Sequence, residues 1–284
     1  ADPATITMDG NKVVTAIFVE VEYSLTVTVL PDSGAGVVTP DNPGPYHLND
    51  EVTLTAEASA GWSFDSATGW SGAGTTNGAG KRVVVIDGDK TVTATFTQNT
   101  YTLTVLKVGN GVVYIVPDQA TYTYGASVDL TAVADSGWIF SVWSGDLTGS
   151  ANPATITMDG DKTVTATFTQ NEYTLEISII GSGSVVKAPD QLKYHLGDVV
   201  QLTATPVAGW TFAGWTGDLT GVANPGSVNI DENPSVTAIF TQNEYTLTVN
   251  VVGSGSVSKV PEKPTYTYGE VVTLDPNPAV GWIF

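Results

Sequence analysis

The feature that most constrains this chain is an internal repeat of 72 residues. The segment Thr169–Leu175 reads TQNEYTL and returns unchanged at Thr241–Leu247, and a near copy, TQNTYTL, begins at Thr97. A Gly-Trp-x-Phe motif keeps the same period, with tryptophans at Trp138 and Trp210 among others. Self-similarity at a fixed period indicates several copies of one structural unit. The 284 residues, which by length alone suggest about two domains, therefore hold about four units' worth of one repeat.

A tyrosine ends each linking segment, and we place the boundaries after it. We call the resulting ranges the N-terminal segment, the first, second and third repeats, and the C-terminal half-repeat. The N-terminal segment then holds the last strands of a split repeat, and the C-terminal half-repeat holds the first strands of one. The first repeat is complete and carries loop insertions. In that order, the ranges are 1–23, 24–101, 102–173, 174–245 and 246–284.

Within a repeat, hydrophobic residues recur at every second position. In the stretch TVTATFT, Val164, Ala166 and Phe168 alternate with threonines. This period, with Val, Thr and aromatic side chains, is typical of half-buried β-strands, and no stretch shows an amphipathic helix of useful length. We therefore expect an all-β chain, a tandem array of small β-sandwich or barrel-like domains with about six short strands each.

Two kinds of glycine-containing turn separate the predicted strands. Asp-Gly pairs such as Asp159-Gly160 lie between two alternating runs, and a GSGS stretch at Gly181–Ser184 recurs at Gly253–Ser256. Asp-Gly between alternating runs is a strong signal of a two-residue hairpin turn. We predict a β-hairpin at each of these places.

The linker between repeats is short. The last predicted strand of the second repeat ends at Phe168, and the next repeat begins near Tyr173, with only Thr169–Glu172 between them. This linker lacks the Gly, Ser and Pro residues that are typical of long linkers, so neighbouring domains have little freedom to rotate. Compact domains joined in this way predict a spacer in the form of a rod.

Composition excludes several classes of function. Charged residues make up 14% of the chain, against about 25% in an average protein. The net charge of −19 would repel nucleic acids, whose binding requires Lys and Arg. Cysteine is absent and histidine occurs twice, so we expect no metal site and no cofactor. No apolar run reaches the roughly 18 residues of a membrane span, so we expect no membrane insertion in this segment.

At GWIFSVWSGDLTG (137–149) and DGDKTVTATF (159–168) the sequence resembles the divergent InlB B-repeat group, which is related to the Listeria–Bacteroides repeats. The resemblance covers the whole chain, once per repeat. It implies tandem modules of secreted or surface-anchored prokaryotic proteins, often stalks and adhesins, with a β-grasp-like fold as the alternative to a sandwich. It implies no catalytic residues. The third repeat departs from the pattern where Pro234 replaces the lysine that is found as Lys90 and Lys162.

The tryptophans beside glycine-rich turns, Trp70, Trp143 and Trp215, are the candidate ligand-binding residues. Indole faces suit the stacking of sugar rings, which would make a surface glycan or a host-cell molecule the partner. Against this, a domain of about 72 residues needs large aromatic side chains to fill its core. We favour the core role for these three residues and for the tryptophans of the Gly-Trp motif.

Acidic turns and histidines are weaker candidates. Asp146, Asp159 and Asp161 could gather oxygen atoms around Ca²⁺, but no spacing resembles an EF-hand loop, and a turn explains each of them. His47 and His195 occupy matching positions without the partner that acid–base catalysis requires. We therefore predict no metal ligand and no catalytic residue.

The N-terminal segment and the C-terminal half-repeat together make one repeat, except for a stretch that corresponds to Ser141–Ser150. One interpretation, which we favour, is that the chain is a window onto a longer array. In the other, the N-terminal strands of one copy complete the half-repeat of the next by strand complementation. The assembly interface would then comprise Ile6, Val14, Ile17, Phe18, Leu247, Val249, Trp282 and Phe284.

These features predict a non-enzymatic, extracellular structural repeat protein that forms a rod, stalk or filament on a prokaryotic cell surface. Its partners would be neighbouring repeats or copies of the same chain. The alternative is an adhesin or carbohydrate-binding module that uses the loop-side tryptophans.

Overall fold

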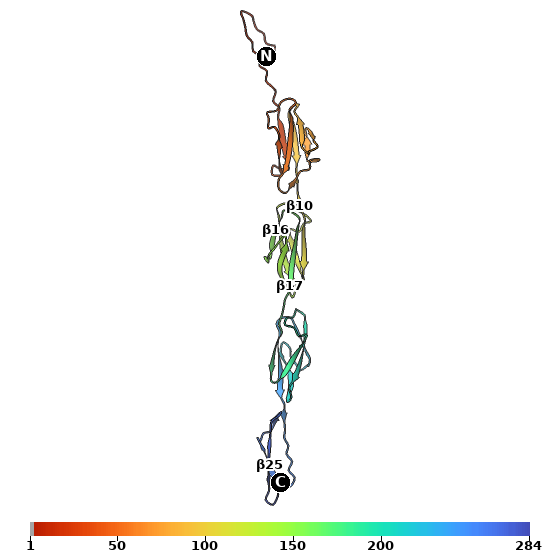
Figure 1. The fold of residues 1–284 in the computed structure, drawn as a ribbon, viewed down its shortest axis with the longest axis vertical. Coiled ribbons are helices and arrows are strands. Elements are labelled where there is room, and N and C mark those ends of the chain that lie inside the picture. Colours follow the sequence, from red (N-terminus) through yellow and green to blue (C-terminus); the bar gives the residue numbers. More distant parts are fainter. Residues whose placement is uncertain (1–2) are drawn as a thin grey trace. The chain divides into compact units, whose positions relative to one another are not determined.

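In the computed structural model, which describes residues 3–284, every regular element is a β-strand (Figure 1). The all-β expectation is therefore confirmed. Within these residues there is no helix of the length and apolar character needed to cross a membrane.

The chain divides into two compact units. One contains the residues up to 106 with 113–132 and 143–166, and the other contains 107–112, 133–142 and 167–284. The first repeat lies wholly in the first unit and the third repeat wholly in the second. We describe the architecture from these two repeats.

The first repeat is a two-layer β-sandwich. Its strands are β1 (Leu25–Leu30), β2 (Gly36–Pro40), β3 (Glu51–Ala58), β4 (Trp62–Ser63), β5 (Trp70–Gly72), β6 (Thr75–Thr76), β7 (Arg82–Val85), β8 (Lys90–Thr95) and β9 (Thr97–Gln98). One sheet has the order β1-β8-β5, the other has the order β2-β3-β7-β6, and β4 pairs with β9. The first and last long strands, β1 and β8, are parallel, with Val27 opposite Val92. The other paired strands are antiparallel.

The core of the first repeat lies between the two sheets, because alternate residues of the long strands are apolar and point inward. Strand β3 buries Val52 and Leu54, and β8 buries Val92 and Ala94, while threonines alternate with them. The predicted period of two residues is thus confirmed as the pattern that fills this core.

The third repeat has the same architecture with six strands. These are β18 (Glu176–Ile180), β19 (Gly183–Ala188), β20 (Val199–Pro206), β21 (Trp210–Gly217), β22 (Gly226–Asn229) and β23 (Ser235–Gln242). The sheet orders are β18-β23-β21 and β19-β20-β22, and β18 runs parallel to β23. A bulge between Phe212 and Gly214 interrupts the register of β21 on β23.

The second repeat contains strands of similar length and order. These are β11 (Leu103–Val108), β12 (Gly111–Val116), β13 (Tyr122–Thr123), β14 (Ala126–Ala134), β15 (Trp138–Gly145), β16 (Ala154–Met158) and β17 (Lys162–Gln170). The short strand β10 (Thr100–Tyr101), at the end of the first repeat's range, pairs with β13.

The two hairpin predictions are wrong, because both turns connect one sheet to the other. The turn at Asp87-Gly88 joins β7 to β8, and that at Gly181–Ser184 joins β18 to β19, but in each case the two strands belong to different sheets. In the second of these turns, Gly181 allows the backbone of the turn to lie close to the backbone of Phe240. A Cβ on Gly181 would lie 2.3 Å from the carbonyl oxygen of Phe240. The sequence correctly indicated tight turns, but the pairing of the strands is decided by which faces share the core.

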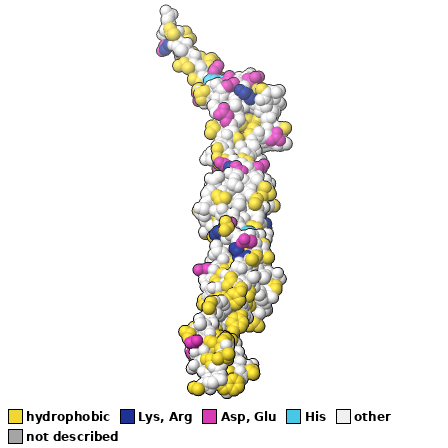
Figure 2. Space-filling view, turned by 60° about the horizontal axis from the view of Figure 1, so that its bottom comes forward, with side chains coloured by type: hydrophobic (Ala, Val, Ile, Leu, Met, Phe, Trp, Pro, Cys, Tyr) yellow, Lys and Arg dark blue, Asp and Glu magenta, His cyan; other side chains and the backbone are white. Residues whose placement is uncertain are grey.

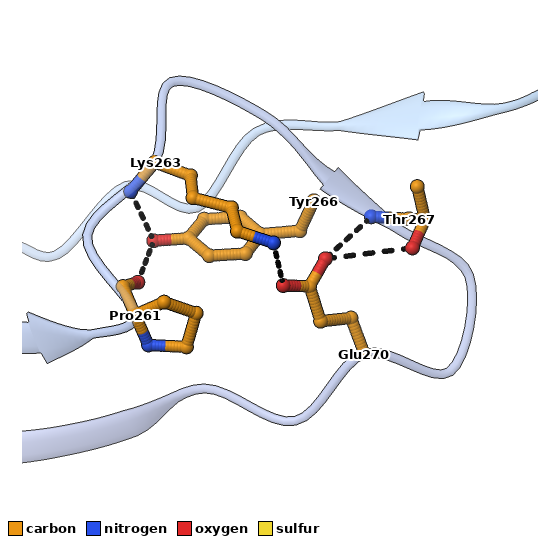
Figure 3. A network of polar contacts seen from close by, with 5 residues as sticks. All are labelled: Pro261, Lys263, Tyr266, Thr267 and Glu270. Atoms are coloured by element: carbon orange, nitrogen blue, oxygen red, sulfur yellow. Dashed lines mark hydrogen bonds and ion pairs between the residues drawn. The ribbon is translucent and has the colours of Figure 1, made fainter.

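The C-terminal half-repeat keeps part of this fold. Its strands are β25 (Gly255–Val260), β26 (Tyr266–Thr267) and β27 (Thr273–Pro278), with β25 antiparallel to β27. The short strand β24 (Glu244–Tyr245), at the end of the third repeat's range, pairs with β26. The Tyr266 hydroxyl donates to the carbonyl of Pro261 at 3.0 Å, and the Glu270 carboxylate accepts from the Thr267 N–H and from the Lys263 ammonium (Figure 3). The same tyrosine bond recurs in the third repeat.

The N-terminal segment differs from the repeats. Its residues 3–22 form no strand, and all of them are exposed.

Candidate functional site

The three loop-side tryptophans are buried. Trp143, Trp215 and Trp70 are 1%, 2% and 7% exposed. Each indole N–H donates to a backbone carbonyl of the loop that follows, at 2.8 Å for Trp143 and Trp215 and 3.1 Å for Trp70. An indole enclosed in this way offers no face on which a sugar could stack. All three side chains belong to the buried hydrophobic residues of their repeats.

The loop after Trp215 shows what this clamp does. The backbone N–H of Trp215 donates to the carbonyl of Gly221, and its indole N–H donates to that of Ala223. The side-chain amide of Asn224 then bonds both the N–H and the carbonyl of Ala204, at 2.9 and 2.7 Å. The loop is therefore tied to both sheets. Sequence reasoning did not identify Asn224, although its motif Ala-Asn-Pro recurs one period earlier, around Asn152.

The aspartates of the acidic turns already bond backbone, hydroxyl or lysine groups of their own repeat. Asp161 accepts hydrogen bonds from the backbone N–H of Thr102 at 2.7 Å and from its hydroxyl at 2.9 Å, which hold the pKa of Asp161 below its ordinary value. Asp159 lies 2.5 Å from the Lys162 ammonium, whose hydrogen bond lowers the pKa of Asp159. Asp146 accepts from the N–H of Thr163. Within residues 3–284, no group of three or more His, Asp or Glu side chains is placed to hold a metal ion.

Both histidines lie in a turn that the following Asp closes. The backbone N–H of His195 donates to Asp198 at 2.8 Å, and that of His47 donates to Asp50 at 2.7 Å. The His47 imidazole also lies 3.4 Å from Glu20. These hydrogen bonds order the turn in both repeats.

The predicted assembly residues are largely exposed. In the N-terminal segment, Ile6, Val14, Ile17 and Phe18 are all exposed, and in the half-repeat Trp282 and Phe284 are also exposed. Leu247 and Val249 are partly buried. The half-repeat has a hollow of about 150 Å³ whose lining includes Trp282 and Phe284. Figure 2 shows hydrophobic side chains gathered on the surface of this C-terminal region.

The first and third linkers have continuous backbone pairing. In the first joint, β9 pairs with β4 of the first repeat and β10 pairs with β13 of the second. Asn99, the residue between β9 and β10, donates its N–H to the carbonyl of Gly61 at 2.8 Å. In the third joint, β23 pairs with β21, β24 pairs with β26, and the N–H of Asn243 donates to Gly209 at 2.8 Å. No residue between these repeats is left to act as a free hinge.

Comparisons with known proteins identify the repeat. A family model described as the divergent InlB B-repeat domain matches residues 25–100, 101–172, 173–244 and 245–284. No curated protein sequence matches the chain. Among solved structures, "The Bacillus anthracis TIE protein" matches with 10% identity and a TM-score of 0.39, over 77% of this chain and 50% of that one. The chain thus spans half the length of that protein.

Proposed function

The chain belongs to the divergent InlB B-repeat family, and on that premise we propose that it is a non-enzymatic structural segment of an extracellular protein on a prokaryotic cell surface. The repeats would serve as a rod or stalk that holds other parts of the protein, or other copies, at a distance. The observation that carries this proposal is the continuous backbone pairing of the first and third linkers.

The physical argument is that a spacer needs stiffness between domains more than it needs a site. A linker whose residues all pair with one repeat or the next cannot swing as a Gly/Ser chain does. The polar groups at the candidate sites are also committed, because Asp146, Asp161 and Asn224 bond backbone groups of their own repeat. Alternate threonines solvate the outer faces of the strands, which explains how so few charged residues suffice.

Small-angle X-ray scattering of the purified chain tests the rod. A compact protein of this length would have a radius of gyration of about 19 Å. We expect roughly twice that value, because three repeats and a half-repeat in line would spread the mass along one axis. A radius near that of a compact protein would overturn the rod. Protease treatment of intact source cells tests the location, and the surface role fails if repeat peptides are released only after lysis.

We also propose that residues 4–18 and the C-terminal half-repeat are complementary parts of one repeat, joined between copies. Residues 4–18 closely repeat the sequence of 154–168, which forms β16 and most of β17. In the half-repeat, the partly buried Leu247 and Val249 stand where Leu175 and Ile177 pack against the core of the third repeat. A second copy would supply these strands in a head-to-tail contact, which propagates into a filament.

Sedimentation velocity over a range of concentrations tests this assembly. The wild-type chain should form head-to-tail oligomers, and Phe18→Asp should abolish them, because a charge would enter the apolar interface. Val37→Asp, which changes an exposed apolar residue outside this interface, is the matched control and should leave the oligomers intact. A wild-type chain that stays monomeric at every concentration would overturn assembly between copies.

The adhesin alternative loses its main support through the burial of Trp70, Trp143 and Trp215. A glycan-binding surface would have to use other residues, and among residues 3–284 we find no cluster that favours one.

A further inference from the structure

In the three complete repeats, the glycine of the Gly-Trp turn lies directly against the following repeat. A Cβ on Gly61 would lie 2.3 Å from Cγ of Tyr124, one on Gly137 would lie 2.9 Å from Cβ of Leu196, and one on Gly209 would lie 2.2 Å from Cβ of Tyr268. Real Cβ atoms do not approach other atoms so closely. We call Gly61, Gly137 and Gly209 the seat glycines, and Tyr124, Leu196 and Tyr268 their partner residues.

The same glycines hold the linker. The carbonyl oxygen of each seat glycine accepts the backbone N–H of the linker asparagine at 2.8 Å, from Asn99, Asn171 and Asn243 in turn. A seat glycine thus makes one backbone hydrogen bond to the linker and one close contact with the next repeat. All three have positive φ, between 78° and 82°, a conformation that also favours glycine.

Glycine at these positions could serve the positive φ or the close contact with the next repeat. A glycine elsewhere in the chain separates these two reasons. Gly197, which follows the partner residue Leu196, has a φ of 88°, and a Cβ there would meet nothing within 4 Å. A positive φ therefore favours glycine at a position with no close neighbour as well. What distinguishes the seat glycines is contact with another repeat.

We propose that the seat glycine and its partner residue form the recognition surface between consecutive repeats, and that this contact sets the orientation of one repeat on the next. This recognition surface fits another repeat of the same type, one that carries Tyr or Leu at the position of Tyr124, Leu196 and Tyr268. Leu48 holds this position in the first repeat, within the same His-Leu pair as Leu196, and it is 58% exposed. It presents an open surface suited to the Gly-Trp turn of another repeat.

The close contact between the two repeats depends on the absence of a side chain at the seat glycine. Without a Cβ, the turn of one repeat and the side chain of the next meet at backbone distance, and the hydrogen bond from the linker keeps them in register. Adding one methyl group at a seat would force the two repeats apart by a distance comparable to the overlap, which neither backbone can absorb locally. This contact would exist wherever the protein resides, so it is independent of the proposed surface role.

Pulsed electron–electron resonance on the full chain tests the proposal. The chain has no cysteine, so Thr157→Cys and Asn229→Cys provide unique labelling sites. Both are exposed strand positions, one in each of the two repeats that the second joint connects. We expect one narrow distance distribution for this labelled chain. Gly137→Ala should shift or broaden it, whereas Gly197→Ala, at a similar positive φ without a neighbour, should leave it unchanged.

Two further variants separate recognition from simple loss of folding. Leu196→Ala should broaden the distribution, and Leu196→Tyr should keep it narrow, because Tyr is the partner residue in the first and third joints. Circular dichroism and tryptophan fluorescence should be the same for all variants. A distribution that is already broad in the labelled wild type, or that is unaffected by Gly137→Ala, would overturn the proposal. A loose joint of this kind would leave the cell-surface location untouched, so the two failures are distinguishable.

Discussion

The second repeat and the N-terminal segment contain nearly the same sequence in two different states. Residues 152–168 form β16 and most of β17, where Met158 and Phe168 are buried. Their counterparts in residues 2–18 are Met8 and Phe18, and Phe18 is 93% exposed against 2% for Phe168. The described residues of the N-terminal segment form no strand. Alternation of apolar and polar residues is therefore a property that allows a strand, and the strand forms only where neighbouring strands cover its apolar face.

The largest expected effect comes from truncating the two equivalent phenylalanines. Phe168→Ala should lower the free energy of unfolding by about 3–5 kcal/mol, because it leaves a cavity in the core of the second repeat. Phe18→Ala should change the same quantity by less than about 0.5 kcal/mol in the monomer. Urea denaturation followed by tryptophan fluorescence measures both. Equal losses would mean that the N-terminal segment is packed in solution, and the comparison would fail.

A smaller effect is expected from the asparagine clamp, which the second and third repeats share through Asn152 and Asn224. Asn224→Ala removes both hydrogen bonds to Ala204 and leaves that backbone pair unsatisfied beneath the loop, so we expect a loss of about 1–3 kcal/mol. Asn229→Ala, on an exposed position of β22, is the control and should be near neutral. The measurement is again urea denaturation, and similar values for the two variants would contradict the clamp.

The sequence predicted the repeat, the all-β fold and the alternation that fills the core, because these depend on local period and composition. It did not predict which strands pair. The parallel pairing of β1 with β8 joins residues about a whole repeat apart, and the turns at Asp87-Gly88 and Gly181–Ser184 resemble hairpin turns locally. The exposure of Trp143 and Trp215 was left open for a similar reason. Their position beside Gly-rich turns does not reveal that the loop folds back over the indole.

A pH-dependent difference is expected between the second and third repeats. The turn before the last strand is tied to the first strand by Asp161 in the second repeat and by Asn233 in the third. The hydrogen bond from the Thr102 N–H lowers the pKa of Asp161 from its ordinary value of 3.8. The folded state therefore favours the charged form. The stability that this carboxylate contributes is present above pH 3.8 and is lost as the pH falls through the lower folded pKa.

Thermal unfolding of Asp161→Asn at neutral pH and below pH 3.8 tests this difference. At neutral pH the variant should resemble the wild type, because the Asn233 amide oxygen accepts the same two bonds from Thr174, at 2.8 and 3.2 Å. Below that pH the variant should lose less stability than the wild type. An identical acid dependence of the two proteins would show that Asp161 does not contribute.

The smallest effect is expected at the turn lysine. Lys162 pairs with Asp159 at 2.5 Å on the surface, while the third repeat has Pro234 at this position and folds into the same two sheets. Exposed ion pairs contribute little because water and salt screen them. Lys162→Gln should therefore leave the midpoint of urea unfolding nearly unchanged at physiological salt, and the small remaining difference should vanish at high salt. A clear loss that persists at high salt would assign the lysine a packing role that Pro234 must replace by other contacts. The two repeats would then share a fold without sharing the means of closing this turn.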